Sequence, residues 1–231
     1  MDPRFDVPTY TRAEVALHLG LPLTTLGAWL RSGALEAPTA PARGEVTITF
    51  AGLVETHMLR ELRQAGLPLQ AIEDAAVTLR SKLDRHHPLA WQGLAHDGRD
   101  LLIELAADGQ DPAWERIRDS QGGLPGLVRR GSEAVTWAPD GYPSSLRLVA
   151  YTDVAVQIDP LRAEGRPIVE TPDGREIRVE DVVDQARAGT PYRTIAGRNG
   201  LEATEIEALV RPHIRPPTVH RRRKSTDDVL L

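Results

Sequence analysis

The chain has 231 residues, a formal net charge of −5 at pH 7 and 41% hydrophobic residues. This length fits one large domain or two to three small ones, and the hydrophobic share is sufficient for a packed core. The acidic balance disfavours strong non-specific binding of the whole chain to nucleic acid.

Several protein classes are disfavoured by the composition. No run of about 18 apolar residues occurs, which argues against a membrane span, and the N-terminus has no apolar secretion segment. Cysteine is absent, so disulfides and thiolate zinc sites are excluded, and a reducing compartment fits. We therefore expect a cytoplasmic protein with no membrane partner.

The N-terminal residues predict two short helices joined through a glycine. Thr11 and Glu14 form a capping-box pattern at the start of the first helix, which Gly20 ends. A second helix is expected from about residue 22 to residue 31. Its buried face would consist of Leu26, Trp29 and Leu30. Two helices in this arrangement are typical of a helix-turn-helix.

A wing and two longer helices are expected next. Residues 36–45 are rich in Pro, Ala and Gly, and residues 46–50 resemble a short strand, so the two segments would form a wing. Amphipathic helices follow over residues 51–65 and beyond the break at 66–68. The segments LGLPLTTLGAWLRSGAL, FAGLVETHMLRELRQAG and GLPLQAIEDA resemble the MerR-like winged helix-turn-helix family over residues 8–84. That resemblance implies a dimer that reads the major groove.

The candidate DNA-binding residues are Thr24, Thr25 and Arg31 on the second helix and Arg43 in the wing. Sequence-specific binding needs side chains that reach base edges and cations that contact phosphates. Gly27 and Ala28 stand where related helices often carry arginine. Dimerisation across two half-sites would strengthen weak binding by each copy. The alternative is a helix-turn-helix retained only for assembly.

Residues 89–158 predict a β-rich α+β module. Asp97-Gly98 and Asp140-Gly141 are turn patterns between apolar runs, and residues 112–117 are expected to form a short helix. No chemical role is assigned to this module.

The C-terminal part predicts a hairpin followed by three helices, which form a second helix-turn-helix-like unit. Residues 167–170 would pair with residues 176–179, and helices are expected over 180–188, 191–198 and 202–211, with Thr190 capping the second. The third helix carries Glu202, Glu205 and Glu207. Carboxylates face DNA phosphates unfavourably, so protein docking or dimerisation is favoured over DNA binding for this unit.

The segments IDP, GRPIV, VEDVV, AGTP and EIEALV resemble a small domain of VapB-type antitoxins, and with the MerR-like N-terminus the resemblance covers nearly the whole chain. It implies a PIN-like ribonuclease toxin and operator DNA as partners. It also implies a homodimer within a toxin–antitoxin hetero-oligomer.

The last segment is a basic tail. Residues 211–231 carry six Lys or Arg and two Asp, and Pro216-Pro217 isolate the end of the chain. Such a segment would be extended when free and would order on a partner. The candidate toxin-binding residues are Arg215, Arg221, Arg222, Arg223, Lys224, Leu230 and Leu231.

The resemblance suggests how this tail would act. PIN-like toxins hold a metal ion in a carboxylate cluster, and we hypothesise that one of Arg221, Arg222 or Arg223 enters that cluster as a bidentate partner. The rival interpretation is a non-specific DNA-binding arm.

No catalytic, metal-binding or cofactor-binding residue is predicted. His86-His87 are interpreted as capping or surface groups, and residues 123–131 lack the Lys-Ser/Thr of a phosphate-binding loop. The chain is therefore expected not to be an enzyme.

The sequence thus predicts an α+β chain in four parts. Residues 1–88 are the winged helix-turn-helix, 89–158 the middle module, 159–214 the antitoxin-type unit and 215–231 the toxin-binding tail. The leading hypothesis is an antitoxin that neutralises a co-encoded ribonuclease and represses its own operon. The alternatives are a MerR-like regulator whose middle module binds a small effector, and a scaffold without a DNA role.

Overall fold

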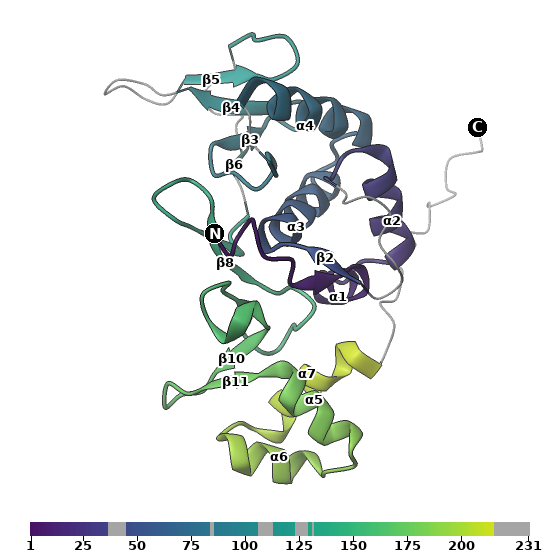
Figure 1. Cartoon of the computed structure of the whole chain (residues 1–231), viewed down its shortest axis with the longest axis vertical. Helices are drawn as coiled ribbons and strands as arrows, with labels where there is room; N and C mark the ends of the chain where they lie inside the picture. Colours follow the sequence, from purple (N-terminus) through teal and green to yellow (C-terminus); the bar gives the residue numbers. More distant parts are fainter. Residues whose placement is uncertain (37–44, 84–85, 106–112, 123–128, 131, 215–231) are drawn as a thin grey trace, which may run out of the picture.

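The computed structural model describes residues 1–36, 45–83, 86–105, 113–122, 129–130 and 132–214. Helices and sheets are both present, which confirms the α+β class. Along the long axis of Figure 1, a small sheet with a long helix stands at one end and a three-helix bundle at the other. The N-terminal helices lie between them.

The N-terminal unit contains two short strands and four helices. They are β1 (Tyr10–Thr11), α1 (Arg12–His18), α2 (Leu23–Ser32), β2 (Val46–Ile48), α3 (Phe50–Gln64) and α4 (Leu69–Leu83). The predicted capping box is confirmed: the Glu14 N–H donates to Thr11 Oγ1 at 3.1 Å, and the Thr11 N–H donates to Glu14 Oε2 at 2.7 Å. These two bonds satisfy backbone donors that the first turn of α1 would otherwise leave unpaired.

The strand predicted over residues 46–50 is shorter in the structure. Strand β2 ends at Ile48, because the Thr49 hydroxyl accepts the Gly52 N–H at 3.2 Å and so caps α3, which begins at Phe50. Strand β2 pairs antiparallel with β1. Arg43 and the rest of the predicted wing loop lie outside the described residues.

A four-stranded antiparallel sheet follows, packed beside α4 (Figure 1). Its strands are β3 (Leu94–His96), β4 (Leu101–Leu105), β5 (Ala113–Arg116) and β6 (Arg129–Arg130), in the order β5-β4-β3-β6. The helix predicted over residues 112–117 is wrong, because residues 113–116 pair with Leu102–Leu105 of β4. Cross-strand pairing here overrides local helix propensity.

The second sheet has five antiparallel strands. They are β7 (Val135–Trp137), β8 (Pro143–Arg147), β9 (Val156–Ile158), β10 (Ile168–Glu170) and β11 (Glu176–Arg178), and a 3-10 turn, η1 (Ala163–Gly165), precedes β10. The hairpin predicted between residues 167–170 and 176–179 is confirmed. Because β9 pairs with β10, this sheet runs unbroken across residue 158, where the sequence placed a boundary.

Three helices close the chain: α5 (Val179–Arg187), α6 (Tyr192–Asn199) and α7 (Ala203–Ile214). Thr190 does not cap α6 as predicted, because Pro191 takes the capping position and provides no side-chain hydrogen bond. Helix α7 continues through Pro212 to Ile214, three residues beyond the expected end.

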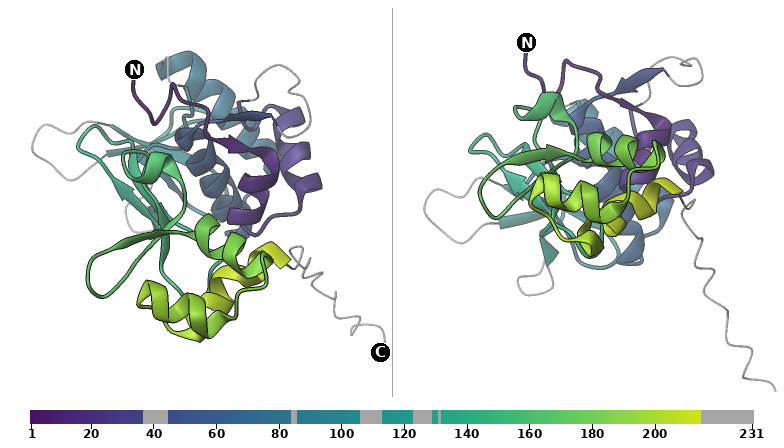
Figure 2. Two further views of the ribbon diagram at one scale, coloured as in Figure 1. Left: turned by 60° about the horizontal axis from the view of Figure 1, so that its bottom comes forward. Right: turned by 90° about the horizontal axis from the view of Figure 1, so that it is seen from below.

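The core is continuous from the N-terminal unit to the bundle. Leu26 and Phe50 at one end, Leu146 in the second sheet, and Val182 and Leu209 at the other end belong to one cluster of buried side chains. Figure 2 shows the end of α7 beside α1, and these two helices are in contact. Within the described ranges, no helix is long and apolar enough to cross a membrane.

Candidate DNA-binding face and adjoining cavity

Helix α2 has one buried and one outward face. Leu26, Trp29 and Leu30 are buried, as the sequence predicted. The outward side carries Thr24 and Arg31, both exposed, while Thr25 is half-buried. Three of the four predicted DNA-binding residues therefore share one helix, and two of them are fully available to a partner.

The two ends of α2 differ in their hydrogen bonding. At its start, Pro22 offers no capping side chain, so the first backbone N–H groups remain available to an anion such as a phosphate. At its other end, Gly33 adopts the left-handed conformation with φ of 83°. There the Arg80 guanidinium donates to the carbonyl oxygens of Gly33 at 3.0 Å and Ala34 at 3.2 Å.

Gly27 leaves room for Arg31 on the outward face. A Cβ atom at position 27 would lie 3.3 Å from Nη1 of Arg31, so the guanidinium runs along the bare backbone of the preceding turn. Arg31 makes no ion pair with any residue that the structure describes, and its charge is free to meet a phosphate.

The second helix-turn-helix-like unit has the opposite electrostatic character. At the start of α7, the Glu205 carboxylate accepts the Glu202 N–H at 2.7 Å, which occupies the helix end with negative charge. Glu207 is exposed and lies 3.4 Å from Arg211. The exposed cations Arg193 and Arg198 are on α6 instead. This arrangement disfavours insertion of α7 into a DNA groove.

Polar contacts join the N-terminal unit to the C-terminal unit. The Tyr10 hydroxyl donates to the carbonyl oxygen of Gly165 at 2.6 Å in a buried position. The Tyr151 hydroxyl lies 3.0 Å from Nε2 of His213 on α7 and 3.4 Å from Nδ1 of His18 on α1. Burial lowers the pKa of His18 to about 4, so this ring is neutral at pH 7.

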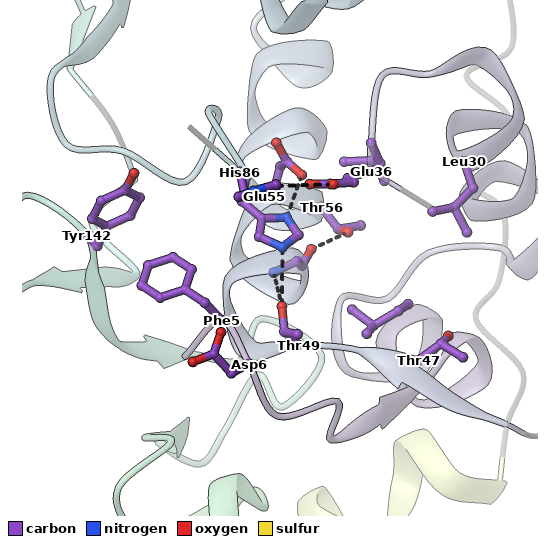
Figure 3. A pocket seen from close by; sticks show the side chains of 14 residues that line it. Phe5, Asp6, Leu30, Glu36, Thr47, Thr49, Glu55, Thr56, His86 and Tyr142 are labelled. Carbon is purple, nitrogen blue, oxygen red and sulfur yellow. Dashed lines mark hydrogen bonds and ion pairs between the residues drawn. The ribbon is translucent and has the colours of Figure 1, made fainter. Parts of the chain in front are cut away.

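A cavity of about 540 Å³ adjoins α2. As Figure 3 shows, Phe5 and Tyr142 lie toward one side of it and Leu30 and Glu36 toward the other, with Thr49, which caps α3, between them. This volume falls within the range of small-molecule sites in proteins.

The floor of the cavity contains Glu55, whose side chain is only 1% exposed. Nδ1 of His87 donates to Glu55 Oε2 at 3.0 Å, and the Leu89 N–H donates to Oε1 at 3.3 Å. Arg80, which also holds the end of α2, approaches Oε1 at 3.8 Å. Hydrogen bonds and a nearby cation compensate the burial of this carboxylate.

The histidine pair was only partly anticipated. His86 is 80% exposed and lies 3.3 Å from Glu36, as expected of a surface group. His87 is 13% exposed and bridges Glu55 to Thr49, whose hydroxyl is 3.4 Å from its Nε2. Neither Glu55 nor a buried role for His87 was predicted. One signal was present, because an acidic residue within the apolar run of α3 requires a buried partner.

The remaining predicted residues are not tested by the geometry. Arg43 and the tail residues Arg215, Arg221, Arg222, Arg223, Lys224, Leu230 and Leu231 lie outside the described residues. Among the residues that are described, no three His, Asp or Glu side chains gather closely enough to hold a metal ion.

Comparison with protein families identifies the helices around α2. Residues 10–76 match the sequence pattern of the family described as "MerR HTH family regulatory protein". The N-terminal part of the chain is a MerR-type helix-turn-helix domain. The matched segment lies within residues 8–84, for which the sequence predicted this domain, and it covers β1 to most of α4.

Two further comparisons extend the likeness beyond the MerR-type domain. The chain is 29% identical over 228 residues to a Mycobacterium tuberculosis protein named "Putative antitoxin VapB45", with 89% of this chain and 94% of the relative covered. It also resembles the crystal structure of Rv2018 from Mycobacterium tuberculosis, with a TM-score of 0.62 and 26% identity over 90% of this chain and 99% of that one. The MerR-type domain and these relatives indicate an antitoxin or a DNA-binding regulator.

Proposed function

We propose that the protein is a cytoplasmic, non-enzymatic antitoxin of a type II toxin–antitoxin system. It binds operator DNA through its MerR-type domain and represses its own operon. It neutralises a co-encoded PIN-like ribonuclease by direct binding. The observation that carries this proposal is the similarity to an antitoxin-named protein along 94% of that relative's length.

The DNA-binding part of the proposal rests on α2. The helix presents Thr24 and Arg31 outward, and its uncapped start offers N–H groups to a phosphate. These groups supply one cation and several neutral donors, which is a modest set for a DNA interface. We therefore propose that the protein binds its operator as a homodimer, so that two copies of α2 act together on paired half-sites.

The toxin-binding part of the proposal rests on sequence. The basic tail is complementary in charge to the carboxylate cluster expected in a PIN-like ribonuclease, and Arg221, Arg222 or Arg223 would enter that cluster. Arg215 and Lys224 would support this contact, and Leu230 and Leu231 would anchor the end of the tail. The hairpin and the α5–α7 bundle would serve as the docking platform beside it.

A regulator that responds only to a small effector is the competing function. The two readings predict different neighbours on the genome, because an antitoxin must be encoded beside a reading frame whose product is toxic alone.

Co-expression tests the proposal directly. The neighbouring reading frame is expressed alone and together with this chain, and an affinity tag on this chain is used to recover bound protein. We expect growth arrest in the first case, rescue in the second and co-purification of the neighbour. A harmless neighbour, or one that arrests growth without being rescued, overturns the antitoxin assignment.

A further inference from the structure

The cavity beside α2 has a distinct chemical character. Among the described residues, its lining includes the carboxylates of Asp6, Glu36 and Glu55 and no Lys or Arg. Asp6 and Glu36 are exposed, and Glu55 is buried in the floor. Because Arg80 and His87 already offset Glu55, the exposed carboxylates of Asp6 and Glu36 are the groups that favour a positively charged occupant over an anion.

The walls add apolar and aromatic surface. Leu30 on α2, Leu35 just after it and Ile48 on β2 are buried side chains that line the cavity. Phe5 and Tyr142 form an edge-to-face pair with ring centroids 4.8 Å apart. The Arg4 guanidinium already lies over the Phe5 ring, 5.2 Å from its centroid, so the Phe5–Tyr142 pair contributes mainly apolar surface to the cavity. A ligand with both a positive charge and an apolar body would find a partner for each part.

The wall also holds an unsatisfied polar atom. The Thr47 hydroxyl oxygen is buried and has no hydrogen-bond partner among the residues described. Buried polar atoms in proteins are nearly always paired with protein, water or ligand. Thr47 thus carries an unpaired hydroxyl beside the cavity, although the oxygen itself is shielded from the open space.

A metal ion fits this lining less well than an organic cation. No three His, Asp or Glu side chains in the described part of the chain are grouped as metal ligands. The imidazole of His87 and the carboxylate of Glu55 are already joined to each other at 3.0 Å. The volume of about 540 Å³ also exceeds what a single ion fills.

We propose that this cavity binds a small organic cation, with the charge near Asp6 and Glu36 and an apolar body against Leu30, Leu35 and Ile48. Phe5 and Tyr142 cover the ligand from the opposite side. The residues named here all belong to the N-terminal unit except Tyr142, which lies just before β8.

Binding of a matched pair of probes tests the proposal. Benzyltrimethylammonium carries an aromatic body and a positive charge, and 3-phenylpropionate has a similar body and a negative charge. Each is titrated into the full-length protein while methyl NMR signals of Leu30, Leu35 and Ile48 are followed. We expect saturable shifts of these methyl groups with the cation only.

Two double variants test which carboxylates lie near the positive charge of the bound ligand. Asp6→Asn with Glu36→Gln removes the exposed carboxylates of the cavity, and Asp74→Asn with Glu202→Gln removes two exposed carboxylates elsewhere. We expect the first pair to weaken binding of the cation about threefold to tenfold, since each exposed charge contributes up to about 1 kcal/mol. The second pair should leave the affinity unchanged.

Three outcomes would overturn the site. They are no saturable shift at millimolar cation, equal binding of the anion, and equal loss of affinity in the two double variants. Urea unfolding of each variant confirms that the chain remains folded, so that a lost shift reports binding and not unfolding.

Discussion

The guanidinium of Arg166 lies 2.8 Å from the carboxylate of Glu14, and this ion pair joins helix α1 of the MerR-type domain to the segment before β10. Glu14 also closes the capping box with Thr11. Burial would raise the pKa of Glu14, but the Thr11 hydrogen bonds and the charge of Arg166 outweigh it, and the pKa lies below its usual value. One carboxylate thus stabilises a helix and links two units distant in sequence.

The contribution of this link is measurable in a double-mutant cycle. Glu14→Gln retains the capping box, because glutamine also reaches back to the Thr11 N–H, but it removes the charge. Combined with Arg166→Ala, we expect a coupling free energy of about 0.5 to 1 kcal/mol, because both side chains are partly exposed. Urea unfolding at pH 7 provides the measurement.

A second cycle serves as the control. Arg178 at the end of β11 and Asp181 in the first turn of α5 form an exposed pair at 3.6 Å, and their coupling should be close to zero. A Glu14–Arg166 coupling no larger than this value would show that the link adds nothing to stability.

Buried histidines predict a loss of stability in acid. Burial lowers the pKa values of His18 and His57 from 6.5 to about 4. Below about pH 6.5 the unfolded chain binds a proton at each histidine, while the folded chain does so only near pH 4. The free energy of unfolding therefore falls as the pH decreases through this window, by about 2 kcal/mol per histidine between pH 7 and pH 5.

Substitution of His57 isolates one of these contributions. Nε2 of His57 is 2.7 Å from the Ser132 hydroxyl, and His57→Gln retains a polar group at this place. We expect this variant to lose less stability than the wild type when the pH is lowered from 7 to 5. His86→Gln, at a side chain that is 80% exposed, is the control. An unchanged pH dependence in His57→Gln would contradict the assignment.

The sequence predicted correctly those elements that depend on residues close together in the chain. The Thr11–Glu14 box and the hairpin after residue 167 both depend on residues close in sequence. The expected helix over residues 112–117 failed because its partner, β4, comes from a separate part of the chain. Cross-strand pairing cannot be read from the propensity of one segment.

The cavity could not be predicted from the sequence for a similar reason. Glu55, Arg80 and His87 come from two helices and a loop, and only the fold places their charges together. The apolar run of α3 gave a partial indication, since an acid inside it requires a buried partner. Nothing in the sequence indicated that this partner would be one of two adjacent histidines.

The outward face of α2 predicts how operator binding changes on mutation. Arg31→Ala should weaken binding to DNA taken from upstream of the gene by about 1 kcal/mol and reduce the salt slope by about one, as for the loss of one phosphate contact. Thr24→Ala should weaken binding to that DNA more than to unrelated DNA if it contacts bases. Fluorescence anisotropy at two salt concentrations measures both effects.

The second helix-turn-helix-like unit provides the matched control. Arg193→Ala removes an exposed cation from α6, outside the MerR-type domain, and should leave operator affinity unchanged. A larger loss with Arg193→Ala than with Arg31→Ala would assign DNA binding to the C-terminal unit instead.

The end of α7 sets where the tail should be truncated. His213 contacts Tyr151 at 3.0 Å, so a chain that ends at Arg211 would lose part of the join between the two units. A chain of residues 1–214 keeps this contact and removes every predicted toxin-binding residue. We expect this chain to unfold at the same urea concentration as the full chain, bind operator DNA with the same affinity and fail to rescue growth from the toxin. Rescue equal to that of the full chain would exclude the tail from neutralisation, and loss of operator binding with rescue intact would make the tail a DNA-binding arm.

Replacing Arg221, Arg222 and Arg223 by glutamine in the full chain then tests the charge itself, since the length and the terminal leucines are retained.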